Sequence, residues 1–147
     1  MQAWDQYEGA DPWGRRVLPR EHFFNLLDLE VKRARRYQNF FSILVMRVKK
    51  LASHDNGVNL SSCYQKLAHL LREEIRESDI VGFIDDNSIA ALLPYGDAVC
   101  GENAKSRFDR NLKFFDFPKE GYEIKVDQVC FPMDVTNTSD LIKRLVS

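Results

Sequence analysis

The order of hydrophobic patterns along the chain predicts an α/β (α+β) fold of the ferredoxin-like class, an antiparallel β-α-β-β-α-β sheet with flanking helices. Three observations support this prediction. Residues 40–48 form a nearly continuous apolar run, which is typical of a central strand. Residues 80–84 and 88–93 are apolar runs joined by Asp-Asp-Asn, the pattern of a tight hairpin. Apolar residues recur at helical spacing before and after this hairpin.

Composition is that of one soluble globular domain. The 147 residues are 44% hydrophobic and 29% charged, which supports a single core and argues against disorder. The net charge of -1 provides no whole-molecule attraction to nucleic acid. The three cysteines lie far apart with no CxxC pair, so we expect reduced thiols in a cytoplasmic protein. No apolar run approaches the length of a membrane span, so we expect no membrane insertion.

We expect the chain to consist of an irregular N-terminal lead-in and one domain. Residues 1–18 mix Trp, Gly, Pro and charges without a period, which predicts an irregular segment. A single domain over residues 19–147 should follow. It should begin with a helix that Pro19 opens and that ends near Arg36, because apolar residues recur there at helical spacing and cations occupy the last turns.

The remaining elements follow from the same patterns. Asp-Asn-Gly in residues 53–59 predicts a loop after the central strand. The second helix should run directly into the hairpin, so Arg76 and Asp79 should share a helix-to-strand corner beside the sheet. The expected elements after the loop are a helix at 60–76, strands at 80–84 and 88–93, a helix at 101–115, a strand at 122–131 and a last helix from Thr138 or Ser139.

Five short stretches stand in a fixed order along the chain. They are L-P-R-E-H-F at 18–23, the apolar strand near Leu44, R-E-S-D-I-V at 76–81, A-L-L-P at 91–94 and V-C-F-P at 129–132. No single stretch is specific, but such a collinear series is hard to obtain by chance. The series resembles the GGDEF domain of diguanylate cyclases from about residue 18 to the C-terminus. That resemblance implies an elaborated β-α-β-β-α-β fold, in agreement with the patterns above.

The resemblance also implies an altered catalytic site. The family's name-giving pentapeptide corresponds to the hairpin turn, where Asp85 and Asp86 replace the two glycines and Ser88 replaces an acidic residue that serves the metal. The family's other magnesium carboxylates correspond to Arg47 and Lys49, which cannot supply oxygen ligands. We therefore expect a degenerate GGDEF domain that is not an enzyme and holds no metal or cofactor.

The resemblance extends to a second site of the family, which binds a ligand. Arg76-Glu77-Ser78-Asp79 stands five residues before the pentapeptide positions, where many cyclases have an R-x-x-D that binds cyclic di-GMP as an inhibitor. A further family arginine on the next helix corresponds to Arg107. A guanidinium can donate two bonds to guanine O6 and N7, and a carboxylate can accept from guanine N1–H and N2–H. The ligand-binding residues are thus predicted to be Arg76, Asp79 and Arg107.

The sequence leaves three functional hypotheses open. The first is a cyclic di-GMP receptor that signals to an unidentified protein partner, which includes the possibility of a homodimer. The second is a ligand-independent interaction scaffold, for which the basic cluster at residues 32–36 is the supporting feature. The third is an altered nucleotide-processing enzyme, although no carboxylate pair or nucleophile replaces what is lost. R-x-x-D at a helix end is also commonly a surface ion pair worth about 0–1 kcal/mol.

Overall fold

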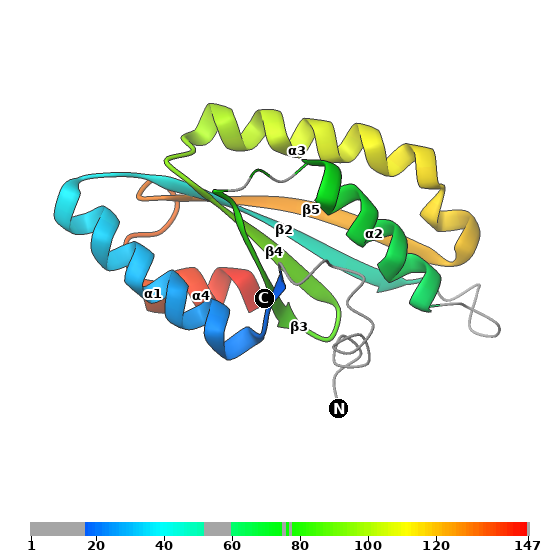
Figure 1. Ribbon diagram of the computed structural model, residues 1–147, viewed down its shortest axis with the longest axis horizontal. Helices are drawn as coiled ribbons and strands as arrows, with labels where there is room; N and C mark the ends of the chain where they lie inside the picture. Colours follow the sequence, from blue (N-terminus) through cyan, green and yellow to red (C-terminus); the bar gives the residue numbers. More distant parts are fainter. Residues whose placement is uncertain (1–16, 52–59, 75, 77, 147) are drawn as a thin grey trace.

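The computed structural model describes residues 17–51, 60–74, 76 and 78–146 (Figure 1). The predicted β-α-β-β-α-β order is confirmed as β2-α2-β3-β4-α3-β5, whereas the predicted loop at 53–59 lies outside the described residues. The elements are β1 (Val17–Leu18), α1 (Arg20–Tyr37), β2 (Phe41–Lys50), α2 (Leu60–Glu74), β3 (Ile80–Asp85), β4 (Ser88–Pro94), α3 (Ala98–Leu112), the 3-10 helices η3 (Lys113–Phe115) and η4 (Phe117–Glu120), β5 (Tyr122–Phe131) and α4 (Thr138–Val146).

The five strands form one sheet in the order β1-β3-β4-β2-β5. The four strands of the predicted core pair antiparallel throughout, as expected. β1 pairs parallel to β3, with Val17 opposite Val81 and Leu18 opposite Gly82, which makes the whole sheet mixed. The assignment of Val17 and Leu18 to the irregular lead-in was therefore wrong, because pairing with a strand more than 60 residues away leaves no local pattern. Residues 1–16 of the lead-in lie outside the described residues.

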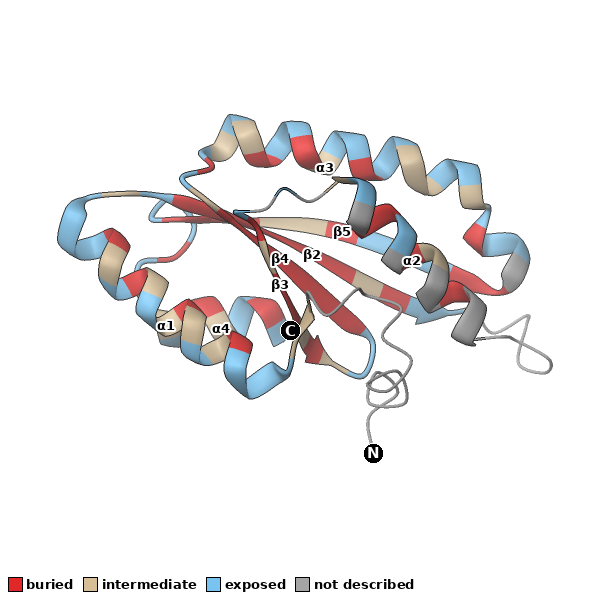
Figure 2. Ribbon diagram, in the orientation of Figure 1, coloured by how far each residue is buried: buried red, intermediate tan, exposed pale blue. Residues whose placement is uncertain are grey.

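Helices cover both faces of the sheet, α1 and α4 on one side and α2 and α3 on the other (Figure 1). Along β2, Ile43 and Val45 pack with α1 and α4, whereas Leu44 and Met46 pack with α2 and α3. Figure 2 shows the result, with buried strands between helices whose outer faces are exposed. Coverage on both faces is why this strand reads as a continuous apolar run. Within the described residues, no helix has both the length and the apolar character to cross a bilayer.

The boundaries of the helices around the hairpin differ from those expected. α2 ends at Glu74, so Arg76 lies beyond the helix and within the corner. α3 begins at Ala98 rather than near residue 101, because the Asp97 carboxylate accepts the backbone N–H of Cys100 and caps the helix. Both differences change which side chains surround the corner.

One hydrogen bond shapes the hairpin turn, and one glycine allows α3 to approach the sheet. The hairpin closes through Asp86 and Asn87, and the Asp85 carboxylate accepts the backbone N–H of Asn87 at 2.8 Å. Gly101 lies inside α3, where a Cβ would come within 2.2 Å of the Gln128 side chain on β5. The missing side chain therefore lets α3 pack closely on the sheet beside the corner.

Candidate ligand-binding pocket

The corner between α2 and β3 holds Arg76 and Asp79 together. The Asp79 carboxylate accepts the backbone N–H of Arg76 at 2.9 Å through Oδ2, and the Asp79 N–H donates to the Arg76 carbonyl at 3.0 Å. The Nε atom of Arg76 lies 3.7 Å from the same Oδ2. One backbone–backbone hydrogen bond and one hydrogen bond from the Arg76 N–H to the Asp79 carboxylate thus close the R-x-x-D corner, and the Arg76 side chain is mostly exposed.

Asp79 is far more buried than its partner. Its side chain is 3% exposed, compared with 61% for the Arg76 side chain. Its second oxygen, Oδ1, is buried and accepts no hydrogen bond from any described residue. Leaving a buried acceptor unsatisfied costs about 1–3 kcal/mol, and more for a charged group. A buried acceptor of this kind is a point at which a ligand's N–H donor would be favourable.

Arg76, Asp79 and Arg107 line one pocket of about 270 Å³ on the face covered by α2 and α3. The three residues named from the sequence therefore lie together in space, although binding of a ligand to them stays a prediction. The other lining residues are apolar at the base and polar at the rim: Leu44, Ala91, Leu93, Ala104 and Phe108, then Glu74, Cys100 and Asn103. An apolar wall with a few convergent polar groups is typical of small-molecule sites.

Arg107 reaches the pocket from α3 and is held by a residue that the sequence analysis missed. Its Nε donates to Oε2 of Glu74 at 3.1 Å, and the Asn111 side chain donates to the other oxygen of Glu74. A signal for Glu74 did exist. An acidic side chain in the last turn of a helix opposes the helix dipole, so a cation from another element would stabilise Glu74 at this position.

A second pocket, of about 410 Å³, lies beside the hairpin turn, where the family resemblance implies magnesium. The Arg47 guanidinium pairs with Asp127 and donates through Nη2 to the carbonyls of Arg144 at 3.1 Å and Leu145 at 3.3 Å, at the end of α4. The charged and polar residues that line this second pocket are Arg47, Lys49, Lys125, Asp85, Glu123, Asn87 and Ser88. Three cations next to two carboxylates do not fit a magnesium ion, which needs hard oxygen ligands. Among the described residues, no three His, Cys, Asp or Glu side chains gather as a metal site.

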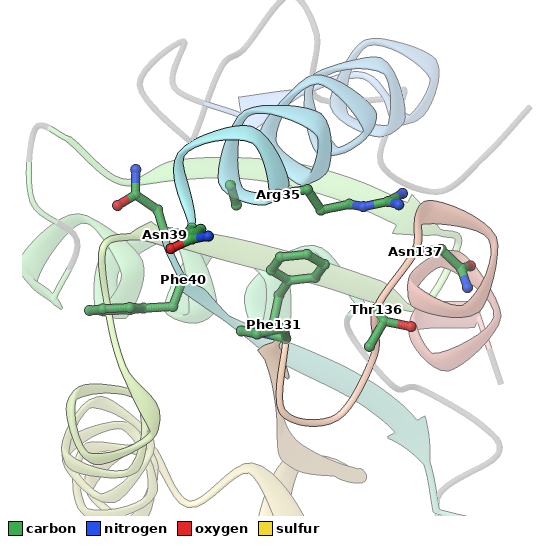
Figure 3. Close-up of a pocket in the computed structure, with 9 residues that line it drawn as sticks. Arg35, Asn39, Phe40, Phe131, Thr136 and Asn137 are labelled. Carbon is green, nitrogen blue, oxygen red and sulfur yellow. The ribbon is translucent and has the colours of Figure 1, made fainter.

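A third pocket, of about 690 Å³, lies between the C-terminal end of α1 and the loop from β5 to α4. Figure 3 shows the Phe131 ring pointing into this space, with Arg35 above it and Thr136 and Asn137 to one side. Ala34 and Phe131 belong to the core on the α1 and α4 face. This pocket is therefore on the opposite face of the sheet from Arg76 and is separate from the predicted site.

Comparison with known proteins identifies the fold through solved structures. No protein-family model matches the chain, and no curated protein sequence matches it. A DGC protein from Thermotoga maritima matches with a TM-score of 0.74 and 21% identity, over 92% of this chain and 97% of that chain. The GGDEF domain of DgcB from Caulobacter crescentus, in complex with c-di-GMP, matches with a TM-score of 0.66 and 10% identity, over 88% and 79%. The chain has the GGDEF fold.

A third match extends the range of proteins that share this GGDEF fold. The diguanylate cyclase SiaD from Pseudomonas aeruginosa, in complex with its activator SiaC, matches with a TM-score of 0.70 and 16% identity. The match covers 88% of this chain and 52% of that one. Structures with this fold thus include cyclases, a complex with c-di-GMP and a complex with a protein.

The expectation that the chain is not an enzyme is contradicted by these matches. The structures that share its fold include a DGC protein and the diguanylate cyclase SiaD, so the fold is that of an enzyme family. The expectation was based on a few positions: Asp85, Asp86 and Ser88 at the turn, and Arg47 and Lys49 on β2. Substitutions at single positions alter local ligand chemistry, but they do not remove the chain from the fold on which that chemistry is built.

Proposed function

We propose that this GGDEF-fold domain binds cyclic di-GMP through Arg76, Asp79 and Arg107 and transmits that binding to a protein partner. The proposal depends most on one observation: a buried oxygen of Asp79 has no hydrogen-bond partner among the described residues. Both arginines line the same pocket as Asp79. The complex of DgcB with c-di-GMP supports the choice of ligand, because that domain shares this fold.

The chemistry of the pocket fits the edge of guanine. A carboxylate accepts from guanine N1–H and N2–H, which would satisfy the Asp79 oxygen. Guanidinium groups donate in pairs to guanine O6 and N7, and each such pair is worth about 1–3 kcal/mol. A hydrogen bond to a charged group adds about 1.5–3 kcal/mol. Together with burial against Leu93 and Phe108, these contributions approach the roughly 8 kcal/mol of micromolar affinity.

Ligand binding would tie together two separate elements of the fold. Arg76 and Asp79 belong to the α2–β3 corner, whereas Arg107 belongs to α3. A ligand held by all three would fix the corner against α3 and alter the surface that both present. The partner that recognises this surface is a second protein or a second copy of the chain, and the SiaD complex with SiaC provides one example of a protein partner for a protein that contains this fold.

Isothermal titration calorimetry with cyclic di-GMP tests the proposal. We expect heat with the wild type, an affinity reduced at least tenfold in Arg76→Ala, and no change with Arg110→Ala, an exposed arginine on the same helix as Arg107. No heat with the wild type, or equal affinities for wild type and Arg76→Ala, would rule out the proposed site. Turnover of GTP with magnesium is measured in parallel, so that ligand binding and catalysis are assessed separately.

A ligand-independent interaction module is the second candidate function, supported by exposed apolar residues at one end of the sheet. Phe41 is opposite Pro94 and Phe131, so the residues just beyond these three strand ends lie together. Several are large and exposed: Phe40 (41%), Tyr95 (59%) and Met133 (75%). A partner captured by wild type and by Arg76→Ala without nucleotide, but not by Phe40→Ser/Tyr95→Ser, would support this module over the receptor.

A further inference from the structure

Glu74 occupies an unusual place at the end of α2. Its side chain is only 15% exposed, and it lines the same pocket as Arg76, Asp79 and Arg107. A carboxylate in the last turn of a helix is disfavoured by the negative end of the helix dipole. The compensation comes from α3, where Arg107 and Asn111 each donate to one carboxylate oxygen. The position of Glu74 therefore serves the α2–α3 contact rather than α2 itself.

The ion pair with Glu74 leaves the terminal nitrogens of the Arg107 guanidinium available to a ligand. Glu74 takes the Nε–H of the guanidinium at 3.1 Å. A guanidinium has five N–H donors, so the two terminal nitrogens keep theirs for a ligand. A long side chain that is already fixed loses less conformational entropy when a ligand arrives. Because Arg107 is otherwise half exposed, this single ion pair decides how well it is oriented.

Glu74 also balances the charge of the pocket. The described residues that line it include two guanidinium groups, Arg76 and Arg107, and two carboxylates, Asp79 and Glu74. Equal numbers of opposite charges give little net attraction for a free phosphate anion. A purine edge is neutral and presents donors and acceptors side by side, so it suits the same set of groups.

We propose that Glu74 is a positioning and specificity-determining residue of this pocket. It orients Arg107 toward a planar base and cancels the positive charge that would otherwise attract free phosphates. The inference rests on the proposed function, because it concerns the same pocket and the same ligand.

The test compares Glu74→Gln with Glu73→Gln. Glu73 is the preceding residue of the same helix turn, is 62% exposed and pairs with His69 at 3.2 Å, so its variant removes the same charge without touching Arg107. Two probes are titrated by calorimetry, cyclic di-GMP and inorganic pyrophosphate. We expect Glu74→Gln to bind cyclic di-GMP about tenfold more weakly and pyrophosphate about tenfold more tightly. Glu73→Gln should match the wild type with both probes.

A third variant separates orientation from charge. Glu74→Asp keeps the negative charge, but its shorter side chain no longer reaches Arg107. We expect it to lose affinity for cyclic di-GMP while still rejecting pyrophosphate. A merely structural role would lower the affinity for both probes together, so the opposite responses of Glu74→Gln are the decisive readout.

The outcomes are distinguishable from failure of the proposed function. If the wild type gives no heat with cyclic di-GMP, the proposed function fails and this inference fails with it. If the wild type binds and Glu74→Gln behaves like Glu73→Gln, only the role of Glu74 is overturned. The role of Glu74 is likewise overturned if Glu74→Gln weakens the binding of both probes equally.

Discussion

Two arginines, Arg76 just before the hairpin and Arg47 on β2 opposite Ser88 beside the hairpin turn, have very different surroundings. The Arg76 side chain is 61% exposed, and the aspartate beside it keeps a buried oxygen without a described partner. The Arg47 side chain is 24% exposed, pairs with Asp127 and donates to two carbonyls at the end of α4. The two regions thus differ in internal hydrogen bonding rather than in residue type: the Arg47 guanidinium bonds three described groups, whereas the Arg76 corner contains an acceptor, Asp79 Oδ1, without a partner among the described residues.

The physical basis of the difference is the end of a helix. The last carbonyls of α4 have no partner within the helix, and a guanidinium is an effective donor to such groups. Arg47 therefore acts as a structural link between β2 and α4. Asp79 differs from Arg47 because one of its hydrogen-bonding atoms has no partner among the described residues. The buried oxygen raises the free energy of the folded protein, and a hydrogen-bond donor on a ligand would lower it. Four experiments test this contrast, in decreasing order of the expected change.

Asp79→Asn should have the largest effect on ligand binding. The amide lacks the charge and presents a donor where guanine also presents donors, so we expect the affinity for cyclic di-GMP to fall by about 100-fold, or about 2.7 kcal/mol. Calorimetry measures the change. Asp86→Asn at the hairpin turn is the matched control, because it removes the same charge outside the pocket. Equal affinities for the two variants would contradict the special role of the Asp79 carboxylate.

Cyclic di-GMP should stabilise the folded domain by a comparable amount. A ligand that binds only the native state at 100 times its Kd adds about 2.7 kcal/mol to the free energy of unfolding. Urea unfolding with and without the ligand measures this increase. At the same ligand concentration the increase should fall to about 0.4 kcal/mol in Asp79→Asn, whose Kd is expected to be about 100-fold higher, and should persist in Arg47→Ala, since Arg47 does not line that pocket. An increase of equal size in Asp79→Asn would place the ligand elsewhere.

Arg47→Ala should lower stability without changing ligand binding. The substitution removes one hydrogen-bond donor from Asp127 and from two carbonyls of α4, so we expect a loss of about 1–2 kcal/mol in the free energy of unfolding. Urea unfolding provides the measurement, and Lys49→Ala in the same pocket is the control because that side chain is exposed. An unchanged unfolding midpoint would show that the link between β2 and α4 contributes nothing.

The smallest effect should be a change in the reactivity of Cys100. This thiol lines the Arg76 pocket and is half-buried, whereas Cys63 and Cys130 are buried. Bound cyclic di-GMP should slow the labelling of Cys100 by a maleimide about threefold or more, since it would exclude the reagent from the pocket. Mass spectrometry of the labelled peptides measures the rate at each cysteine. Unaltered labelling at saturating ligand would mean that the ligand does not enter this pocket.

Much of the architecture could be predicted because it depends on local periodicity. The double-sided burial of β2 appears as a continuous apolar run, and the two-residue turn at Asp86-Asn87 appears as turn chemistry between two such runs. The R-x-x-D corner is equally local, because a backbone hydrogen bond and a bond from the Arg76 N–H to the Asp79 carboxylate close it within four residues. Features of this kind are encoded by neighbours in the chain, so the order of elements and the corner followed from the amino acids.

The remaining features depend on contacts between distant parts of the chain. β1 exists because Val17 meets Val81, and no pattern around residue 17 announces that pairing. Glu74 lines the pocket because α3 brings Arg107 to it from 33 residues away, and Arg47 is occupied because α4 ends beside it. The amino-acid sequence alone was enough for the four core strands, the four α-helices and the spacing of Arg76 and Asp79, since each depends on neighbouring residues. Which charges are satisfied internally depends on where separate elements pack, so that feature is visible in the folded chain and not in the sequence.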